Sequence, residues 1–297
     1  MMMKKLLVPV DFTDQSINAF RFAQDIARQS NGIIQLLHVI PLPVIHDSPL
    51  LPVADLKKQL LEEMTAAVQQ KFLRLVQDYS VENIKISTHV VSGPINSSIL
   101  EFIRDAKTDL VVMGTKGVTG LREWMIGSNT EKIVRTSPVP IVAVKKYGRG
   151  RPIKNIIFPN TLDTGNQEPL ILKIKALQNF FEAILHIVWI NTAITGSKQD
   201  TEIREKLKAF AKRYMLKDYT IHVFHSSDEE SGIIEFTKQM KGDLIAIGTR
   251  GFTGLAHLIT GSIAEDVVNH AQHPVWTYST KPSKSTSNQQ LKWSGWR

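Results

Sequence analysis

The stretch GTKGVTGLREWMIGS at Gly114–Ser128 recurs later in the chain as GTRGFTGLAHLITGS at Gly248–Ser262. Eight of the fifteen positions are identical, and all four glycines are among them. Each stretch follows a short apolar run and is followed by a proline-preceded strand pattern, SPVPIVAV in the first copy and HPVWTY in the second. Self-similarity of this kind predicts that the chain is a tandem duplication.

Outward from the first stretch, strand-like and helix-like segments alternate. Apolar, branched runs predict strands at Lys4–Val10, Ile33–Ile40, Ile84–Val91, Leu110–Met113 and Val139–Val144. Apolar residues at helical spacing predict helices at Gln15–Gln29, Ala54–Tyr79, Ile95–Ala106 and Ser128–Thr136. This alternation is typical of an α/β fold with a doubly wound parallel sheet of five strands, in the order 3-2-1-4-5.

The second half repeats the pattern, with strands expected at Ile153–Phe158, Ala183–Ile190, Tyr219–Phe224, Leu244–Ile247 and Val275–Tyr278. Pro9 aligns with Pro159 at an offset of 150, but Gly114 aligns with Gly248 at an offset of 134. The second copy is therefore shorter. An alignment of His38 with His186, at an offset of 148, places most of the loss after the second strand.

These repeats divide the chain into two domains and a tail. We expect the first domain at residues 1–147, the second at 152–280, and a basic, disordered tail at 281–297. The tail carries four basic residues and no acidic one, which is half of the net charge of +8. The folded part is then only mildly basic, so a nucleic-acid partner is not indicated.

The 297 residues include no cysteine, which excludes disulfides, thiolate metal sites and a cysteine nucleophile. No apolar run approaches the roughly 18 residues of a membrane span, and the first residues lack the features of a signal peptide. We therefore expect a cytoplasmic protein without a membrane partner. The nine histidines form no HExxH pattern, so no metal ligand is assigned.

Each copy carries the pattern G-x2-G-x9-G-S directly after its fourth strand. In the first copy these residues are Gly114, Gly117, Gly127 and Ser128; in the second they are Gly248, Gly251, Gly261 and Ser262. Such a loop brings backbone N–H groups and a helix N-terminus close to phosphate oxygens. The alternative is that the glycines form a turn and the serine caps a helix.

A carboxylate is expected beside this loop. In the 3-2-1-4-5 order, ligands bind where the first and fourth strands end, and these ends carry Asp11 and Gly114. Because like charges repel, a carboxylate suits ribose hydroxyls or an adenine amino group better than a phosphate. The alternative role for Asp11 is that of a helix cap.

With these residues the chain resembles the universal stress proteins, specifically the tandem two-domain, ATP-binding type. The resemblance rests on VPVDFTD at Val8–Asp14, LLHVI at Leu36–Ile40, the glycine pattern and the PVxxV-like final strands, and it covers about residues 3–146 and 152–280. It implies that Asp11 and the backbone of Val39 hold the adenosine of ATP, and that Mg²⁺ accompanies the nucleotide. The phosphates would be bound by Gly114, Gly117, Gly127, Ser128 and Thr130.

The resemblance also implies that the two final strands pair within one chain, which makes the two domains an intramolecular pseudo-dimer. The second copy departs from the nucleotide pattern, because Thr161 stands at the position of Asp11 and Ala264 at that of Thr130. Asn160 or Asp163 is a candidate to replace the carboxylate. Gly248, Gly251, Gly261 and Ser262 would then form at most a weaker second site, and of the alternatives we favour a different ligand together with a role as structural partner.

Three functions compete on these observations. The preferred one is a stress-response protein that binds ATP in its first domain and acts on an unidentified protein partner as a nucleotide-dependent signalling or protective module. The second is a nucleotide-independent interaction scaffold. The third is an enzyme, at most a slow ATP hydrolase, because no catalytic base is evident beside the loop. Further association of whole chains is left open.

Overall fold

The computed structural model describes residues 3–41, 53–115, 128–148, 150, 152–162, 167–193, 197–249 and 263–279, except for the side chains of residues 53–57, 128, 197 and 198. The first copy forms β1 (Lys5–Pro9), α1 (Asp14–Ser30), β2 (Ile33–Ile40), α2 (Val53–Tyr79), β3 (Lys85–Ser92), α3 (Ile95–Asp105), β4 (Leu110–Gly114), α4 (Ser128–Thr136) and β5 (Ile141–Val144). The second forms β6 (Asn155–Pro159), α5 (Glu168–Phe181), β7 (Ile184–Asn191), α6 (Ser197–Arg213), β8 (Tyr219–His225), α7 (Glu229–Gln239), β9 (Leu244–Gly248), α8 (Ile263–His270) and β10 (Val275–Tyr278).

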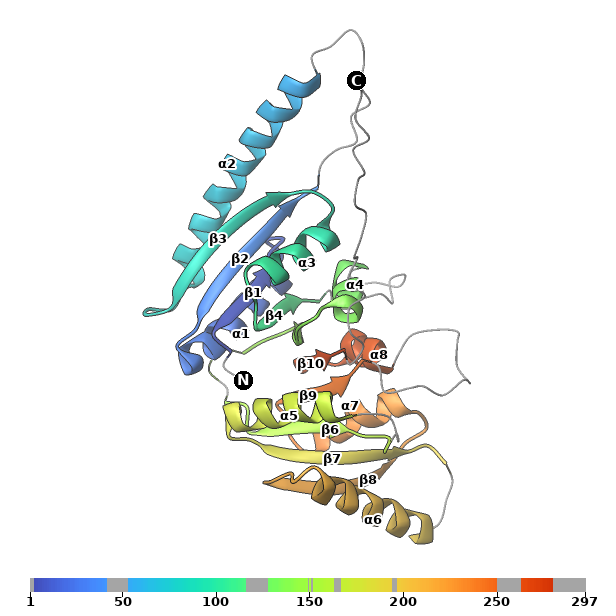
Figure 1. The fold of residues 1–297 in the computed structure, drawn as a ribbon. Coiled ribbons are helices and arrows are strands. Elements are labelled where there is room, and N and C mark those ends of the chain that lie inside the picture. The colour runs from blue at the N-terminus through green and yellow to red at the C-terminus, as the bar shows by residue number, and fades with distance from the viewer. Residues whose placement is uncertain are drawn as a thin grey trace, which may run out of the picture.

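All these strands lie in one ten-stranded sheet of order β3-β2-β1-β4-β5-β10-β9-β6-β7-β8. The strands of each copy are parallel and follow the expected order 3-2-1-4-5, which confirms the predicted fold class. The two copies join where β5 and β10 pair in antiparallel fashion, with Trp276 opposite Val142. Figure 1 shows this junction at the middle of the molecule, with α2 and α6 beside its outer strands.

The pairing of β5 and β10 gives the chain an approximate two-fold axis. Val142 and Trp276 occupy equivalent places in the two repeats and face each other, while Ile141 pairs with Thr277 and Ala143 with Val275. Val142 and Trp276 are each 1% exposed, so the core is continuous across the junction. The predicted pairing of the final strands within one chain is confirmed.

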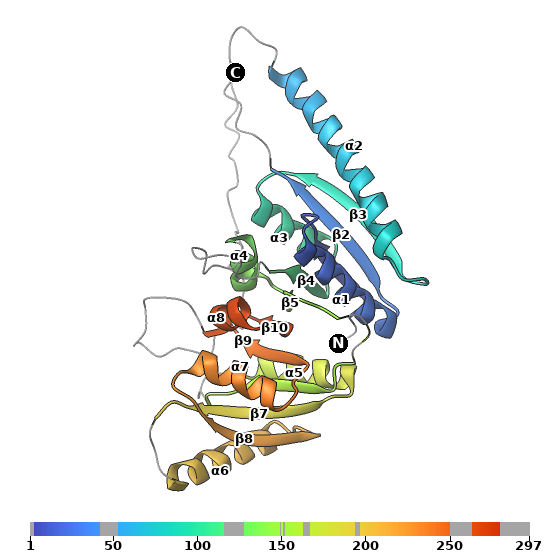
Figure 2. The same cartoon turned by 180° about the vertical axis from the view of Figure 1, so that it is seen from behind.

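Helices cover both faces of the sheet, as a doubly wound topology requires. The core under α1, α2, α5 and α6 is one cluster that runs through both copies, and it includes Phe20, Phe72 and Trp276. On the opposite face, α3 and α4 cover the first copy, and α7 and α8 cover the second. Seen from behind, α1 lies across the strands of the first copy (Figure 2).

Polar contacts tie the copies together on both faces. On one face, the guanidinium of Arg135 in α4 donates to both carboxylate oxygens of Glu265 in α8, at 2.5 and 2.6 Å. Beside this pair, Lys145 Nζ donates to the carbonyl oxygen of Asn269. On the other face, Gln29 at the end of α1 donates to the carbonyl of Phe180 at 2.6 Å. The helices therefore stabilise the junction that the strand pairing forms.

The local signals that begin each copy are also duplicated. Asp109 Oδ2 accepts hydrogen bonds from the backbone N–H groups of Lys4 and Lys5, and Asp243 Oδ2 accepts the same pair from Lys154 and Asn155, all at 2.9 Å. These bonds fix the turn before the fourth strand to the start of the first strand in each copy. The matched pattern supports the alignment of the first strands at an offset of 150.

The sheet register corrects the alignment of the second strands. Pro9 lies opposite Leu37 in the first copy, and Pro159 lies opposite Val188 in the second. The offset is therefore 151, so His38 corresponds to Trp189, and the predicted equivalence of His38 with His186 was wrong. Both histidines are flanked by similar apolar residues, so an alignment of the sequences alone does not show this shift. Only the hydrogen-bonding register of the strands reveals it.

His186 is instead buried in a polar layer on the α7 side of the sheet. Its ring nitrogens lie 2.7 Å from Thr220 Oγ1 and 3.0 Å from Asn155 Oδ1, and burial lowers the pKa of the ring. This histidine is therefore hydrogen-bonded within the fold, as expected for a strand residue.

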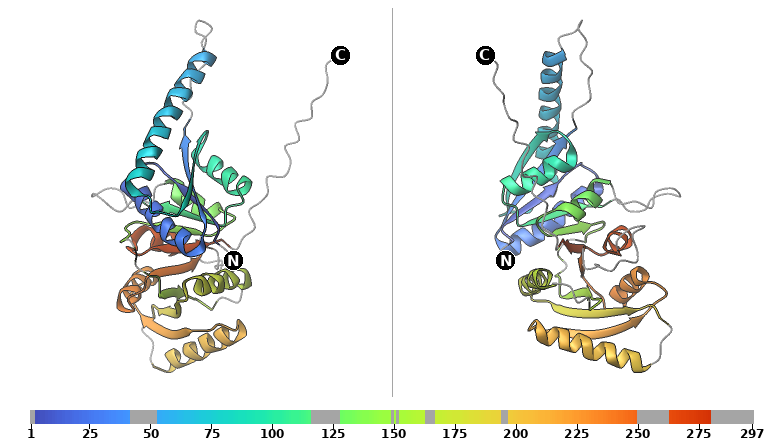
Figure 3. Two further views of the ribbon diagram at one scale, coloured as in Figure 1. Left: turned by 90° about the vertical axis from the view of Figure 1, so that its left-hand side faces the viewer. Right: turned by 45° about the vertical axis from the view of Figure 1, so that its right-hand side comes forward.

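The difference in length between the copies lies mainly between the second and third strands. There the first copy carries the 27-residue helix α2, where the second has the 17-residue α6. One end of α2 extends past the strands, as Figure 3 shows.

Among the described residues, no helix combines the length and the apolar character needed to cross a bilayer. The domain limits at residues 147 and 152 stay predictions, and the tail at 281–297 lies outside the described residues.

Candidate functional site

The candidate site lies where β1, β2 and β4 of the first copy end. β1 pairs with β2 on one side and with β4 on the other, so their carboxyl ends share one edge of the sheet. Asp11 follows β1, Val39 lies near the end of β2, and Gly114 ends β4. The topology therefore brings together three of the residues that the sequence selected.

Asp11 is exposed and forms a local turn with Thr13. Its Oδ1 accepts hydrogen bonds from Thr13 Oγ1 at 2.6 Å and from the Thr13 backbone N–H at 3.1 Å. Partial burial alone would raise the pKa of Asp11, but these hydrogen bonds hold it below its usual value. Both bonds end on Oδ1, so the ionised carboxylate keeps capacity for further donors at Oδ2.

The cap of α1 is Thr13, not Asp11. Thr13 Oγ1 accepts from the backbone N–H of Ser16 at 3.4 Å, and Thr13 adopts the extended conformation usual for an N-cap residue. Asp11 lies two residues earlier and accepts a hydrogen bond from the capping hydroxyl. Thr13 therefore takes the capping role that was the alternative for Asp11.

Gly114 lies directly against the first turn of α1. A Cβ at this position would come within 2.4 Å of the Gln15 carbonyl carbon and 2.6 Å of the Ser16 nitrogen, and backbone cannot move aside as a side chain can. Glycine is thus required here by the close approach of strand and helix. This packing accounts for one of the patterned glycines without a ligand.

Thr130 anchors the first turn of α4 to the same place. Its hydroxyl donates to the Gly114 carbonyl at 3.3 Å, and the residue is buried. Ser128 is the first residue of α4, so the N-terminus of this nine-residue helix lies at the edge of the sheet where β4 ends. A helix N-terminus presents backbone N–H groups and partial positive charge, both of which favour an anion.

β2, which carries Val39, lies on the opposite side of β1 from β4. β2 continues past Leu37, the last residue paired with β1, so the backbone around Val39 extends beyond β1. Here the His38 ring nitrogen Nδ1 lies 2.7 Å from the Val10 carbonyl oxygen. The Phe12 ring stacks at a tilt on His38, with ring centroids 5.1 Å apart.

Sequence reasoning did not select Phe12 and His38 for this site. Phe12 has a φ of 65°, a left-handed conformation that is uncommon for a bulky residue, and Leu162 repeats it in the second copy with a φ of 54°. The VDFTD stretch carries no glycine or asparagine that would have signalled such a turn. The conformation becomes visible only in the folded backbone.

The remaining predicted residues, Gly117, Gly127, Gly251, Gly261 and Ser262, lie outside the described residues, so their roles stay predictions. Among the described residues, no group of three or more histidine, aspartate or glutamate side chains is placed to hold a metal ion.

The second copy presents a different edge. Thr161 supplies no carboxylate there, and Ala264 is buried in α8 without a hydroxyl to reach Gly248. Asn160 uses its amide locally, because Oδ1 accepts from the Leu162 backbone N–H at 2.7 Å and Nδ2 donates to Gln167 Oε1 at 3.2 Å. Asn160 is thus buried and hydrogen-bonded locally, Asp163 lies outside the described residues, and the replacement of the carboxylate by either stays a prediction.

Comparisons with known proteins agree with this architecture. The model of the universal stress protein family matches residues 2–145 and 191–279. Universal stress protein MJ0531 of Methanocaldococcus jannaschii is 30% identical over 143 residues, which cover 48% of this chain and 82% of that protein. Universal stress protein Slr1230 of Synechocystis is 22% identical over 299 residues, which cover 93% of this chain and all of that protein.

A solved universal stress protein from Archaeoglobus fulgidus has the same fold over nearly the whole chain. It superimposes with a TM-score of 0.67 at 17% identity, covering 94% of this chain and 99% of the other. The family model matches both copies of the duplication and spans well over half of the sequence. This chain therefore belongs to the universal stress protein family, with two copies of the family's domain in tandem.

Proposed function

We propose that the first copy binds an adenine nucleotide, ATP with Mg²⁺, at the shared edge of β1, β2 and β4. The observation that carries the proposal is the position of Asp11, whose exposed, ionised carboxylate follows β1 at the sheet edge where β4 ends in Gly114 and where α4 begins. A carboxylate with acceptor capacity left suits the hydroxyls of a ribose. The helix N-terminus at the same edge of the sheet suits phosphate oxygens.

The described residues fit such a ligand chemically. Asp11 would accept hydrogen bonds from the sugar, and the backbone near Val39 would flank the base. The N–H groups that begin α4 would bind phosphate, held in place because Thr130 anchors that turn to Gly114. Mg²⁺, which prefers oxygen ligands, would be carried largely by the phosphates themselves.

The same geometry favours binding over turnover. A general base for hydrolysis works best with a pKa near the working pH, whereas hydrogen bonds lower the pKa of Asp11. His38 Nδ1 is engaged with the Val10 carbonyl. We therefore propose that the chain acts as a nucleotide-dependent module in the stress response, signalling to or protecting a partner according to its nucleotide state.

The proposal is tested by Asp11→Asn. Asparagine keeps an oxygen for the two hydrogen bonds from Thr13, so the turn is preserved, but an NH2 group replaces the second acceptor and the charge is lost. We expect ATP affinity, measured by calorimetry on nucleotide-free protein, to fall about tenfold or more, as for a charged hydrogen bond.

Asp14→Asn is the matched control, because Asp14 is a nearby exposed carboxylate in the first turn of α1. It loses the same charge without changing the proposed ribose contact, and we expect it to bind ATP with nearly unchanged affinity. Equal affinities of the two variants would contradict the assignment of Asp11. Absence of ATP binding by the unaltered protein would favour the nucleotide-independent scaffold instead.

A further inference from the structure

A pocket of about 670 Å³ lies at the junction of the two copies, apart from the edge that carries Asp11. Its walls come from α1, the segment that follows β5, the segment that leads into β6, and the turns before β9 and β10. Both repeats and the connection between them contribute to its walls. Its volume is in the range typical of small-molecule sites.

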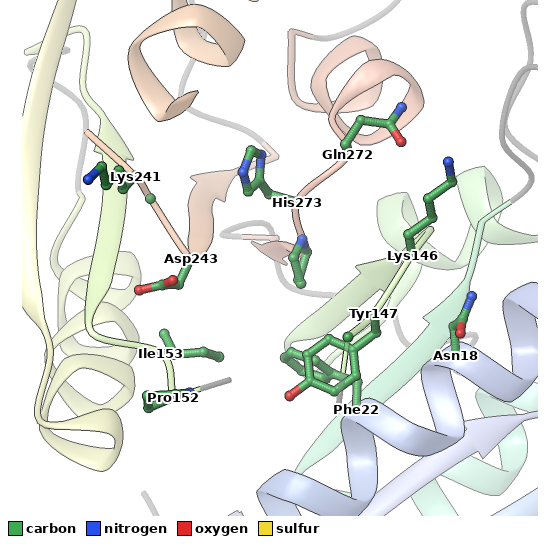
Figure 4. Close-up of a pocket in the computed structure, with 13 residues that line it drawn as sticks. Asn18, Phe22, Lys146, Tyr147, Pro152, Ile153, Lys241, Asp243, Gln272 and His273 are labelled. Carbon is green, nitrogen blue, oxygen red and sulfur yellow. The ribbon is translucent and has the colours of Figure 1, made fainter. Parts of the chain in front are cut away.

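One side of the pocket is apolar and held rigidly. The rings of Phe22 and Tyr147 meet edge to face with centroids 4.9 Å apart, and the Tyr147 hydroxyl donates to Asp25 Oδ2 at 2.7 Å. Pro152 and Ile153 complete this side, as Figure 4 shows. Fixed aromatic and aliphatic side chains of this kind favour a flat, apolar body.

Tyr147 is held in place by Phe22 and Asp25 of α1. A second cavity of about 250 Å³ shares Phe22, Tyr147, Pro152 and Ile153 and extends toward Asp25 and Arg28. Burial and the hydrogen bond to Asp25 raise the pKa of Tyr147, so this phenol stays neutral. The aromatic wall is therefore preformed rather than assembled by a ligand.

The polar side of the pocket carries an excess of positive charge. Lys146 lies on one side and Lys241 on the other, with their amines directed outward at the rim (Figure 4). Asp243 is the acidic residue among the described lining residues, and its Oδ2 is already occupied by the backbone N–H groups of Lys154 and Asn155.

His273 supplies a neutral hydrogen-bonding group between these charges. Its ring lines the pocket, is partly buried, and makes no hydrogen bond within the described part of the chain. Burial lowers the pKa of His273, although Asp243 acts in the opposite direction. The ring can thus donate to or accept from a ligand while the lysines supply the charge.

We propose that this junction pocket binds a small organic anion with a flat apolar body. The body would lie against Phe22 and Tyr147 and the anionic group beside His273, while Lys146 and Lys241, on opposite sides of the rim, would attract the anion from there. The site is independent of the proposed nucleotide site, because none of the residues that line it belongs to the Asp11 edge.

The naphthalene sulfonate dye ANS has this chemistry and serves as the probe. In titrations of the full, native chain followed by fluorescence, we expect one dye molecule per chain. Lys241→Glu should weaken dye binding about tenfold, because an attraction becomes a repulsion at the rim. Lys146→Glu changes the opposite rim and should act in the same direction, which provides a second, independent variant.

Lys206→Glu, on the exposed surface of α6, is the matched control, since it makes the same change of charge away from the pocket. It should leave dye affinity unchanged, as should Asp11→Asn. Equal affinities for Lys241→Glu, Lys146→Glu and Lys206→Glu would overturn the proposal, as would failure of the native chain to bind the dye.

Competition identifies the group that is recognised. Displacement of the dye by 1-naphthyl phosphate or by 1-naphthoate, but not by neutral 1-naphthylmethanol, would support an anion site and distinguish phosphate from carboxylate. Equal displacement by the neutral alcohol would show that charge plays no part and would contradict the proposal.

Discussion

At the scale of single residues, the duplicated glycines do different work in the two copies. Gly114 faces the backbone of Gln15 and Ser16, whereas a Cβ at Gly248 would meet the tip of the Leu170 side chain at 2.7 Å. A side-chain tip can rotate away and backbone cannot. Glycine is therefore required by close backbone contact at position 114, whereas at position 248 the steric requirement for glycine is weaker.

This difference predicts unequal costs for the same substitution. Gly114→Ala should lower the free energy of unfolding by about 2–3 kcal/mol, since strand and helix must separate to admit the methyl group. Gly248→Ala should cost less than about 1 kcal/mol, because Leu170 can change rotamer. Urea unfolding of both variants measures the difference, and similar losses would show that the close approach at Gly114 is not a constraint.

At the scale of elements, α4 and α8 are joined across the junction by an ion pair between Arg135 and Glu265. Each helix follows one copy of the glycine stretch, and Arg135 of α4 joins Glu265 of α8. Glu265 is 6% exposed, while about half of the Arg135 side chain is exposed. The buried carboxylate thus depends on a partner that reaches it from the other copy.

Removal of that partner should destabilise the whole chain. Arg135→Ala leaves Glu265 buried without its guanidinium, and we expect the free energy of unfolding to fall by about 2 kcal/mol, below the cost for fully buried pairs. Glu131, which also contacts Arg135 at 3.0 Å, is more exposed, so Glu131→Gln should cost less than about 0.5 kcal/mol. Thermal unfolding of the two variants measures these costs. An equally small effect of both substitutions would show that the Arg135–Glu265 ion pair does not stabilise the junction.

At the scale of the whole molecule, one continuous sheet holds two repeats of unequal chemistry. The strand order and the antiparallel pairing of β5 with β10 are common to both copies, but the acid that ends β1 has no counterpart at Thr161. The second copy thus supplies the partner that buries the first copy's last strand. That role requires the fold and not the nucleotide residues.

We therefore predict one ATP per chain. Calorimetric titration of nucleotide-free protein should give a stoichiometry of one, and denaturation of freshly purified protein should release at most one nucleotide per chain, identified by chromatography. Thr161→Ala should not change the number of ATP molecules bound per chain, because we propose no ATP contact at Thr161. A stoichiometry of two would show that Thr161 and Ala264 are tolerated in a working site.

The resemblance to the universal stress proteins implied the pairing of the final strands, and the amino-acid sequence by itself determined the duplication and the parallel α/β topology. These follow from hydrophobic periodicity and from repeated motifs, which are local properties of the chain. It also singled out Asp11 and Gly114, because residues that follow adjacent parallel strands must meet at one edge, and the family resemblance added Thr130.

Other features were decided only by the tertiary structure. The register of β7 places Trp189, not His186, at the position of His38. The sequence did not fix this register, because the apolar pattern of the strand is compatible with more than one alignment. The steric role of Gly114, the left-handed turn at Phe12 and the junction pocket arise from segments far apart in sequence or from backbone geometry. Distances between such segments are set by packing in three dimensions, and no pattern along the chain records them.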